Sequence, residues 1–259
     1  MNDLSQLKPK LVRLKLSGVL ETLEQRIAQA MEEKWEYSQF LLNLLTDEVI
    51  RRDNRQLTLR VGRSGLNPEK TIASFDFSFN KHIHKPTIRE LATCSFIEQR
   101  RNLFFVGPSG VGKSHLSQAL GNEACLKNID VMYRGTHELL KWINAGRADG
   151  IAERRMQIVR SVPLLILDDF GLRPLSDVNQ SDLYEIISAR YEKRSTILTS
   201  NRDFAEWPMV FTNPLMGSAA MDRLVHRALK ITIEGDSYRM NSFVKSTKEL
   251  ASGAAKALS

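Results

Sequence analysis

The stretch LFFVGPSGVGKSHLSQAL, residues 103–120, decides the fold class of this chain. A run of four apolar residues, expected to form a buried strand, leads directly into the pattern GxxxxGK[ST], and a helical pattern follows. In such a loop the glycines let successive backbone N–H groups turn toward one point, and the positive N-terminal end of the helix adds to the attraction for an anion. The sequence therefore predicts a phosphate-binding loop in an α/β domain.

The polar positions of this loop have predicted tasks. Lys113 is expected to reach the β- and γ-phosphates of a nucleoside triphosphate, and the Ser114 hydroxyl is expected to bind Mg²⁺. A glycine-rich turn without a ligand is the alternative, and the flanking strand and helix argue against it. The residues predicted to bind ATP or ADP here are Gly107, Pro108, Ser109, Gly110, Val111, Gly112, Lys113, Ser114 and His115.

Two carboxylates follow a second apolar run, in LLILDDFG at 164–171. Ligands of parallel sheets bind at the carboxyl ends of the strands, so both acids are expected to face the triphosphate. Asp168 is suited to hold Mg²⁺, and Asp169 to act as a general base on the attacking water. A cap or a turn is the ordinary explanation for such a pair, but the phosphate-binding loop upstream favours catalysis. Ser200 and Asn201 end a third run, where a polar pair either orients the water or merely forms a turn.

Short apolar runs alternate with helical segments through most of the chain, which predicts a parallel sheet with helices on both faces. The runs stand at residues 103–106, 131–134, 164–168, 196–199 and 231–234. A helix is expected at about 87–101. Before it, apolar residues recur at helical spacing from Leu11 to about Leu59, which predicts two or three amphipathic helices. The predicted organisation is a helical domain at 1–66, an extended linker at 67–85, an α/β domain at 86–245 and a disordered tail at 246–259.

The composition limits which partners and which cellular compartment are expected for this protein. The 259 residues carry a net charge of +7 at pH 7, which favours a nucleic-acid partner, although many basic proteins bind none. No apolar run approaches the roughly 18 residues of a membrane span, and the start of the chain lacks the apolar block of a signal peptide, so we predict a cytoplasmic protein without a membrane partner. Cys94 and Cys125 lack metal-site spacing, so neither zinc nor a disulfide is expected.

These motifs resemble those of the IstB/DnaC-like family of AAA+ ATPases, and within it the IstB-like helpers of insertion-sequence transposition. Besides the phosphate-binding loop and LLILDDFG, the similar stretches are FDF at 75–77, SARYEKRSTILTSN at 188–201, AAMDRLVHRA at 219–228 and GDSYRM at 235–240. The helicase loaders of the family share the ATPase core. The helical N-terminal passage FLLNLLTDEVIRRDNRQ, together with RYEKRSTILTSN, favours the transposition branch.

The resemblance implies an AAA+ core with strand order 5-1-4-3-2, ATP hydrolysis, and ATP-driven assembly of a homo-oligomer on duplex DNA that helps select the target site and stimulates a partner transposase. It implies that Asn201 is a sensor at the γ-phosphate and that Arg239 contacts phosphate. It also places Arg223 where a neighbouring subunit inserts an arginine finger, with Arg190 and Arg227 as rivals. Asp169 departs from the many members that have glutamate at that position. The shorter side chain leaves two alternatives: slow hydrolysis, or a water molecule that bridges the gap.

DNA contact is expected on a basic segment that also carries Trp142. Its candidate residues are Arg134, Lys141, Arg147, Arg154 and Arg155. A solvated helix face is the alternative. The N-terminal helices contact DNA, or they bind the transposase or a neighbouring subunit, which their near-neutral charge favours. Phe75 and Phe77 either pack near adenine or fasten the linker to the core. A transposition helper ranks first, a helicase loader second, and a small-molecule kinase third because the sequence offers no acceptor site or lid.

Overall fold

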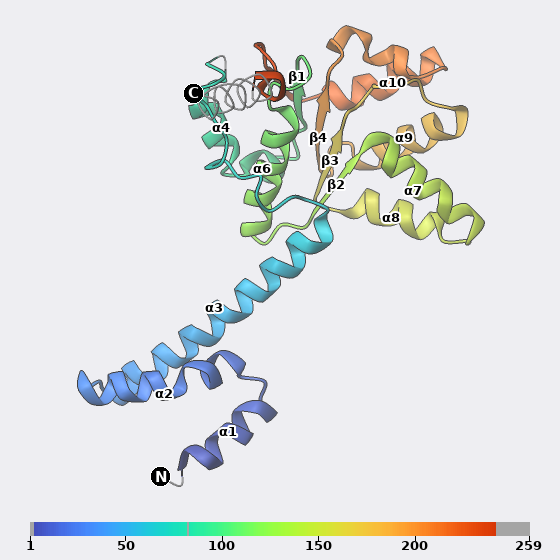
Figure 1. Ribbon diagram of the computed structural model, residues 1–259. Helices are drawn as coiled ribbons and strands as arrows, with labels where there is room; N and C mark the ends of the chain where they lie inside the picture. Colours follow the sequence, from blue (N-terminus) through green and yellow to red (C-terminus); the bar gives the residue numbers. More distant parts are fainter. Residues whose placement is uncertain (1–2, 82, 242–259) are drawn as a thin grey trace, which may run out of the picture. The chain divides into compact units, whose positions relative to one another are not determined.

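The computed structural model describes residues 3–81 and 83–241, and the chain divides into two compact units, Met1–Arg60 and Val61–Ser259 (Figure 1). The tail predicted at residues 246–259 lies outside the described ranges. Within those ranges, no helix combines the length and the apolar character that a membrane crossing requires.

The first unit is helical, which confirms the prediction from the amphipathic pattern. Helix α1 spans Asp3–Arg13, α2 spans Ser17–Glu32, and α3 runs from Tyr37 to Ser64, past the end of the unit. A small core joins them. It consists of Val19 and Leu23 from α2 and Leu44 from α3, with further apolar side chains packed around it.

A carboxylate from α3 caps the first turn of α2. The buried Glu48 side chain accepts hydrogen bonds from the backbone N–H groups of Gly18 at 2.6 Å and Val19 at 3.3 Å. N–H groups in the first turn of a helix have no partner within the helix, so this contact satisfies them. A Cβ atom on Gly18 would lie 2.7 Å from the Glu48 Cα atom. Glycine therefore permits the close approach of the two helices.

The second unit contains a parallel sheet of five strands in the order β2-β3-β4-β1-β5. The strands are β1 at Leu103–Val106, β2 at Val131–Gly135, β3 at Leu164–Asp168, β4 at Ser195–Ser200 and β5 at Leu229–Thr232. Read from the other edge, this is the predicted order 5-1-4-3-2. The prediction of a parallel α/β core is therefore confirmed.

Helices cover both faces of this sheet (Figure 1). Helix α6, Lys113–Leu126, packs on one face. The other face is covered by α7 at Thr136–Ala148, α8 at Ala152–Ser161, α9 at Asp177–Arg190 and α10 at Pro214–Val225, with the 3-10 helix η1 at Phe204–Val210. Alternate strand residues, among them Phe104 of β1 and Leu165 of β3, enter the core below that second layer.

Two local predictions were wrong. The single helix expected at about 87–101 is divided into α4 at Lys85–Leu91 and α5 at Ser95–Glu98, because Cys94 adopts a left-handed conformation with φ of 64° that interrupts the helical path. The last strand begins and ends two residues earlier than the apolar run at 231–234 indicated. It does so because Leu229 pairs with Leu103 at the start of β1.

Candidate nucleotide-binding site

The loop between β1 and α6 is shaped by close neighbours as well as by its own glycines. A Cβ atom on Gly107 would lie 2.0 Å from the carbonyl oxygen of Ile233, and one on Gly110 would lie 2.1 Å from the Ser237 hydroxyl oxygen. The backbone N–H of Tyr238 also donates to the Gly110 carbonyl at 3.0 Å. The segment after β5 therefore lies directly against the loop, where only glycine leaves enough space.

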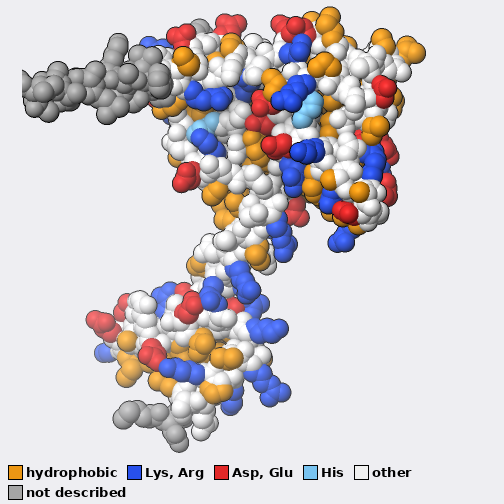
Figure 2. Space-filling model, turned by 45° about the vertical axis from the view of Figure 1, so that its right-hand side comes forward, with side chains coloured by type: hydrophobic (Ala, Val, Ile, Leu, Met, Phe, Trp, Pro, Cys, Tyr) orange, Lys and Arg blue, Asp and Glu red, His pale blue; other side chains and the backbone are white. Residues whose placement is uncertain are grey.

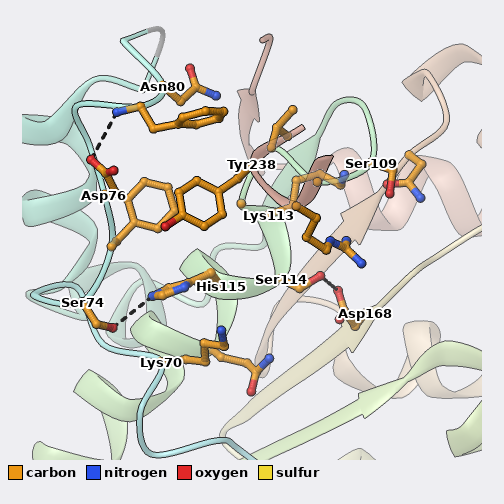
Figure 3. Close-up of a pocket in the computed structure, with 18 of the residues that line it drawn as sticks. Lys70, Ser74, Asp76, Asn80, Ser109, Lys113, Ser114, His115, Asp168 and Tyr238 are labelled. Carbon is orange, nitrogen blue, oxygen red and sulfur yellow. Dashed lines mark hydrogen bonds between the residues drawn. The ribbon is translucent and has the colours of Figure 1, made fainter. Parts of the chain in front are cut away.

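A cavity of about 760 Å³ opens beside this loop (Figure 3). It brings together most of the predicted nucleotide-binding residues: Ser109, Gly110, Val111, Gly112, Lys113, Ser114, His115, Asp168, Asp169, Asn201 and Arg239. Gly107 and Pro108 do not line it. The size and the polar convergence of the cavity match those of small-molecule sites, which measure roughly 300–1,000 Å³.

Aromatic side chains of the segment after α3 form the outer wall of the cavity. Phe75 lines it and stacks edge-on against His115, with 5.1 Å between ring centroids. Phe77 does not line it and instead packs against Phe75 at 4.8 Å. The Asn80 side-chain amide donates to the Glu234 carbonyl at 2.8 Å, so this segment is also fastened to the chain beyond β5. Of the two alternatives for the phenylalanines, Phe75 fits contact with a ligand and Phe77 fits fastening.

Asp168 is the centre of the polar end of the cavity. The Ser114 hydroxyl donates to its Oδ1 atom at 2.8 Å (Figure 3). The Tyr133 hydroxyl donates to its Oδ2 atom at 2.6 Å. The Thr199 hydroxyl also donates to Oδ1. Hydroxyl and carboxylate oxygens side by side fit Mg²⁺, which takes oxygen ligands and is usually held by one or two carboxylates together with substrate phosphates.

Tyr133 and Thr199 were missed by the sequence reasoning. Both belong to strands next to β3, and each reaches Asp168 across the sheet. The signal in the sequence was weak: each is a polar side chain near the carboxyl end of a predicted strand, where ligands of parallel sheets bind. The register between the strands determines which of these polar side chains contact Asp168.

Asp169 lies beside Asp168 in an unusual backbone conformation. Its φ of 52° is left-handed, and its N–H donates to the Thr199 hydroxyl oxygen at 3.1 Å. Burial, and then the negative charge of Asp168, raise the pKa of the Asp169 carboxyl group. Asn201, the other predicted residue at this edge, is exposed and lines the same cavity. Ser200 is buried and donates to the Phe170 carbonyl, so its role is structural.

Lys113 folds back onto the loop that carries it. Its ammonium donates to the Pro108 carbonyl at 2.6 Å, and only 5% of the residue is exposed. Burial lowers the pKa of this lysine to about 8, and the nearby carboxylates of Asp169 and Asp168 only partly oppose that shift. A buried cation next to this loop is suited to receive the phosphates of a ligand.

The arginines lie in different environments. Arg223 is half-buried on α10, where it donates to the Ala219 carbonyl at 2.9 Å and stacks 5.3 Å from the Tyr184 ring centroid. Arg190 is 2% exposed and donates to several backbone carbonyls. A side chain held in this way has no route to a neighbouring subunit. Arg227 is exposed, and Arg239 lines the cavity.

Two arginines lie against the Trp142 ring. Arg134 belongs to β2, Trp142 to α7 and Arg155 to α8. The guanidinium carbons of Arg134 and Arg155 lie 4.9 Å and 5.0 Å from the Trp142 ring centroid. Arg147 is instead paired with Asp182 at 2.6 Å. Lys141 and Arg154 are exposed. Figure 2 shows basic and acidic side chains interspersed on the visible face of the larger unit.

The chain resembles known proteins over most of its length. The family model described as IstB-like ATP binding protein matches residues 9–246. An ATP-binding protein of insertion sequence IS21 from Pseudomonas aeruginosa is 34% identical over 91% of this chain and 89% of the relative. One of insertion sequence IS5376 from Geobacillus stearothermophilus is 32% identical over 88% of this chain and 91% of the relative.

Solved structures share the fold of the larger unit. The DnaC helicase loader is 26% identical with a TM-score of 0.51, over 57% of this chain and 87% of that chain. The replication initiator DnaA bound to AMPPCP and single-stranded DNA is 25% identical with a TM-score of 0.55, over 71% of this chain and 56% of that chain. The larger unit therefore has an AAA+ fold, and the chain belongs to the family of IstB-like ATP-binding proteins.

Proposed function

We propose that this protein is a DNA-binding ATPase that assembles into oligomers on duplex DNA, helps select a target site and stimulates a partner transposase in insertion-sequence transposition. One observation carries the catalytic part of the proposal. Ser114, Asp168 and Asp169 meet at the carboxyl ends of the strands, in the same cavity as the ammonium of Lys113. This arrangement has the parts that phosphoryl transfer to water requires.

Each of these residues has a role in the proposed hydrolysis. Lys113 binds the β- and γ-phosphates, and Asp169 accepts a proton from the attacking water, which Asn201 orients. Ser114 and Asp168 would hold Mg²⁺, which neutralises charge that develops on the phosphates. Arg239, which also lines the cavity, contacts phosphate from the C-terminal side. Arg223 completes the site of a neighbouring subunit.

The proposed DNA contact centres on Trp142 with Arg134 and Arg155. Arginines neutralise phosphates, and an indole ring offers a stacking surface for an unpaired or distorted base. Lys141 and Arg154 add exposed charge on the same segment. Arg147 contributes less, because Asp182 already neutralises it.

The helical unit is proposed to bind the transposase or another subunit. Several apolar side chains of α3 remain exposed, including Leu41 at 56%, Leu45 at 47% and Val49 at 55%. They follow one another at four-residue spacing and therefore form a stripe along the helix. Figure 2 shows apolar side chains gathered on the visible face of this unit. Exposed apolar surface of this kind favours a protein partner over DNA.

The test is size-resolved binding of the purified protein to duplex DNA with ATP, with ADP or without nucleotide, while phosphate release is followed in the same samples. Large complexes that require ATP and shrink as it is hydrolysed are expected. A monomer that ignores duplex DNA and binds a replicative helicase would instead establish the second candidate, a helicase loader, which the likeness to DnaC favours. Absence of phosphate release under every condition would contradict the ATPase proposal.

A further inference from the structure

We infer that Tyr133 is a positioning residue for the magnesium-binding aspartate, Asp168. This inference rests on the proposed function, since it concerns how the same site holds its metal. Tyr133 stands outside the loop and the acidic pair that motif analysis identifies, and its phenol ring reaches the site from the neighbouring strand β2.

The carboxylate of Asp168 is held on two sides. Its Oδ2 atom accepts the Tyr133 hydroxyl at 2.6 Å, whereas its Oδ1 atom accepts the hydroxyls of Ser114, at 2.8 Å, and Thr199. With Oδ2 fixed by the phenol, Oδ1 is directed toward Ser114, the other predicted ligand. Tyr133 therefore determines which carboxylate oxygen is presented beside the Ser114 hydroxyl.

The backbone keeps the phenol in this position. Gly135, two residues beyond Tyr133, pairs with Asp168 in the parallel register of β2 and β3. Gly65 lies directly against the Tyr133 carbonyl, because a Cβ atom on Gly65 would lie only 2.7 Å from it and the glycine has a φ of 79°. A tyrosine side chain anchored at its backbone spans the remaining distance and ends in a hydroxyl that remains a donor at neutral pH.

A hydrogen bond to a metal-binding carboxylate acts on the metal through orientation. Loss of such an outer partner typically weakens metal affinity or activity by about 10- to 100-fold. Because the phenol does not line the nucleotide cavity, its loss should leave contacts between protein and nucleotide intact. The expected signature is therefore a changed requirement for Mg²⁺ with unchanged nucleotide binding in its absence.

The experiment compares full-length wild type, Tyr133→Phe and Tyr191→Phe. Tyr191→Phe is the matched control, because it removes a phenol that also has a hydrogen-bond partner, His226 at 3.2 Å, outside the cavity. ATP binding is measured without metal and across a Mg²⁺ titration, and phosphate release is measured over the same titration. Tyr133→Phe should require about 10- to 100-fold more Mg²⁺ for half-maximal turnover, with wild-type ATP binding in the absence of metal. Tyr191→Phe should match wild type throughout.

Three results would overturn the inference. The first is an unchanged Mg²⁺ requirement in Tyr133→Phe. The second is a loss of metal-free ATP binding in Tyr133→Phe as large as the change in its Mg²⁺ requirement, which would indicate general structural damage. The third is the same defect in Tyr191→Phe. If wild type binds ATP with Mg²⁺ but releases no phosphate, the ATPase proposal fails, and the Mg²⁺ dependence of ATP binding still decides the role of Tyr133. ATP binding by wild type that is independent of Mg²⁺, without turnover, would refute both.

Discussion

Lys113 is the residue on which nucleotide binding is expected to depend most directly, through its side-chain ammonium group. Its pKa is lowered to about 8 because the residue is buried. The free protein therefore loses this proton as the pH rises through about 8, whereas a bound phosphate requires the charged form. Above about pH 8, binding must therefore take up a proton.

ATP affinity should consequently fall as the pH rises from 7.5 to 9.5, with the decline beginning near pH 8. Isothermal titration at several pH values measures this dependence, and proton uptake is read from its variation with the ionisation enthalpy of the buffer. Lys113→Ala should bind weakly throughout and lose the pH-dependent step. Equal wild-type affinity at both ends of the range would contradict a lowered pKa for Lys113 in the free protein.

Asp169 gives a second residue-level expectation. Left-handed φ angles are tolerated better by aspartate and asparagine than by most residues, which explains why this position has the shorter acid. Asp169→Asn should therefore preserve the backbone and ATP binding but reduce phosphate release by at least about 100-fold, the range for loss of a general base. Turnover at the wild-type rate would assign the base elsewhere.

Arg223 and Arg190 are distinguished by their surroundings. Arg223→Ala should retain ATP binding and lose turnover, because the missing group would act on a neighbouring subunit. Arg190→Ala should instead lower stability, because each buried carbonyl left without a partner costs about 1–3 kcal/mol. Phosphate release and urea unfolding of both variants separate the two effects. Normal hydrolysis by Arg223→Ala would show that the finger is a different residue.

At the level of elements, the close contact between α2 and α3 depends on Gly18, which has no side chain. Gly18→Ala would place a methyl group against the backbone of α3, and overpacking of this kind costs about 1–3 kcal/mol. Urea unfolding followed by circular dichroism measures the loss. The matched control is Gly62→Ala, also in a helix, where an added Cβ atom meets nothing within 4 Å. That variant should be neutral or more stable by up to about 1 kcal/mol. Equal behaviour of the two variants would contradict the packing argument.

At the scale of the whole molecule, the sequence was sufficient for the parallel sheet and the phosphate-binding loop, because apolar runs and the loop have strong local patterns. The order of the strands was implied by the family resemblance and not by those patterns. It was insufficient where contacts cross between strands. Tyr133 meets Asp168 through strand register, and Arg190 is buried because carbonyls of distant residues converge on it. Neither arrangement has a local pattern. The sequence also did not predict that the helix is interrupted at Cys94, because the residue with the left-handed backbone is neither a glycine nor next to a proline.

Assembly is the prediction that belongs to the whole molecule. Lys113→Ala should abolish ATP-dependent oligomers on duplex DNA, because without the phosphate contact the nucleotide no longer joins subunits. Light scattering after size separation measures the change. Lys193→Ala removes an exposed lysine that does not line the cavity, and it should assemble like wild type. Oligomers of unchanged size in Lys113→Ala would separate assembly from nucleotide binding.

Trp142, with the guanidinium groups of Arg134 and Arg155 over its ring, gives the molecule an optical reporter of its own. The chain has three tryptophans. Trp207 is fully buried among aromatic rings, and Trp35 belongs to the helical unit. Among the described residues, Trp142 is the tryptophan whose ring has guanidinium groups over it, those of Arg134 and Arg155. Its fluorescence is therefore the one expected to be quenched when a nucleobase replaces an arginine against the indole, so binding at this segment becomes visible in real time without any attached dye.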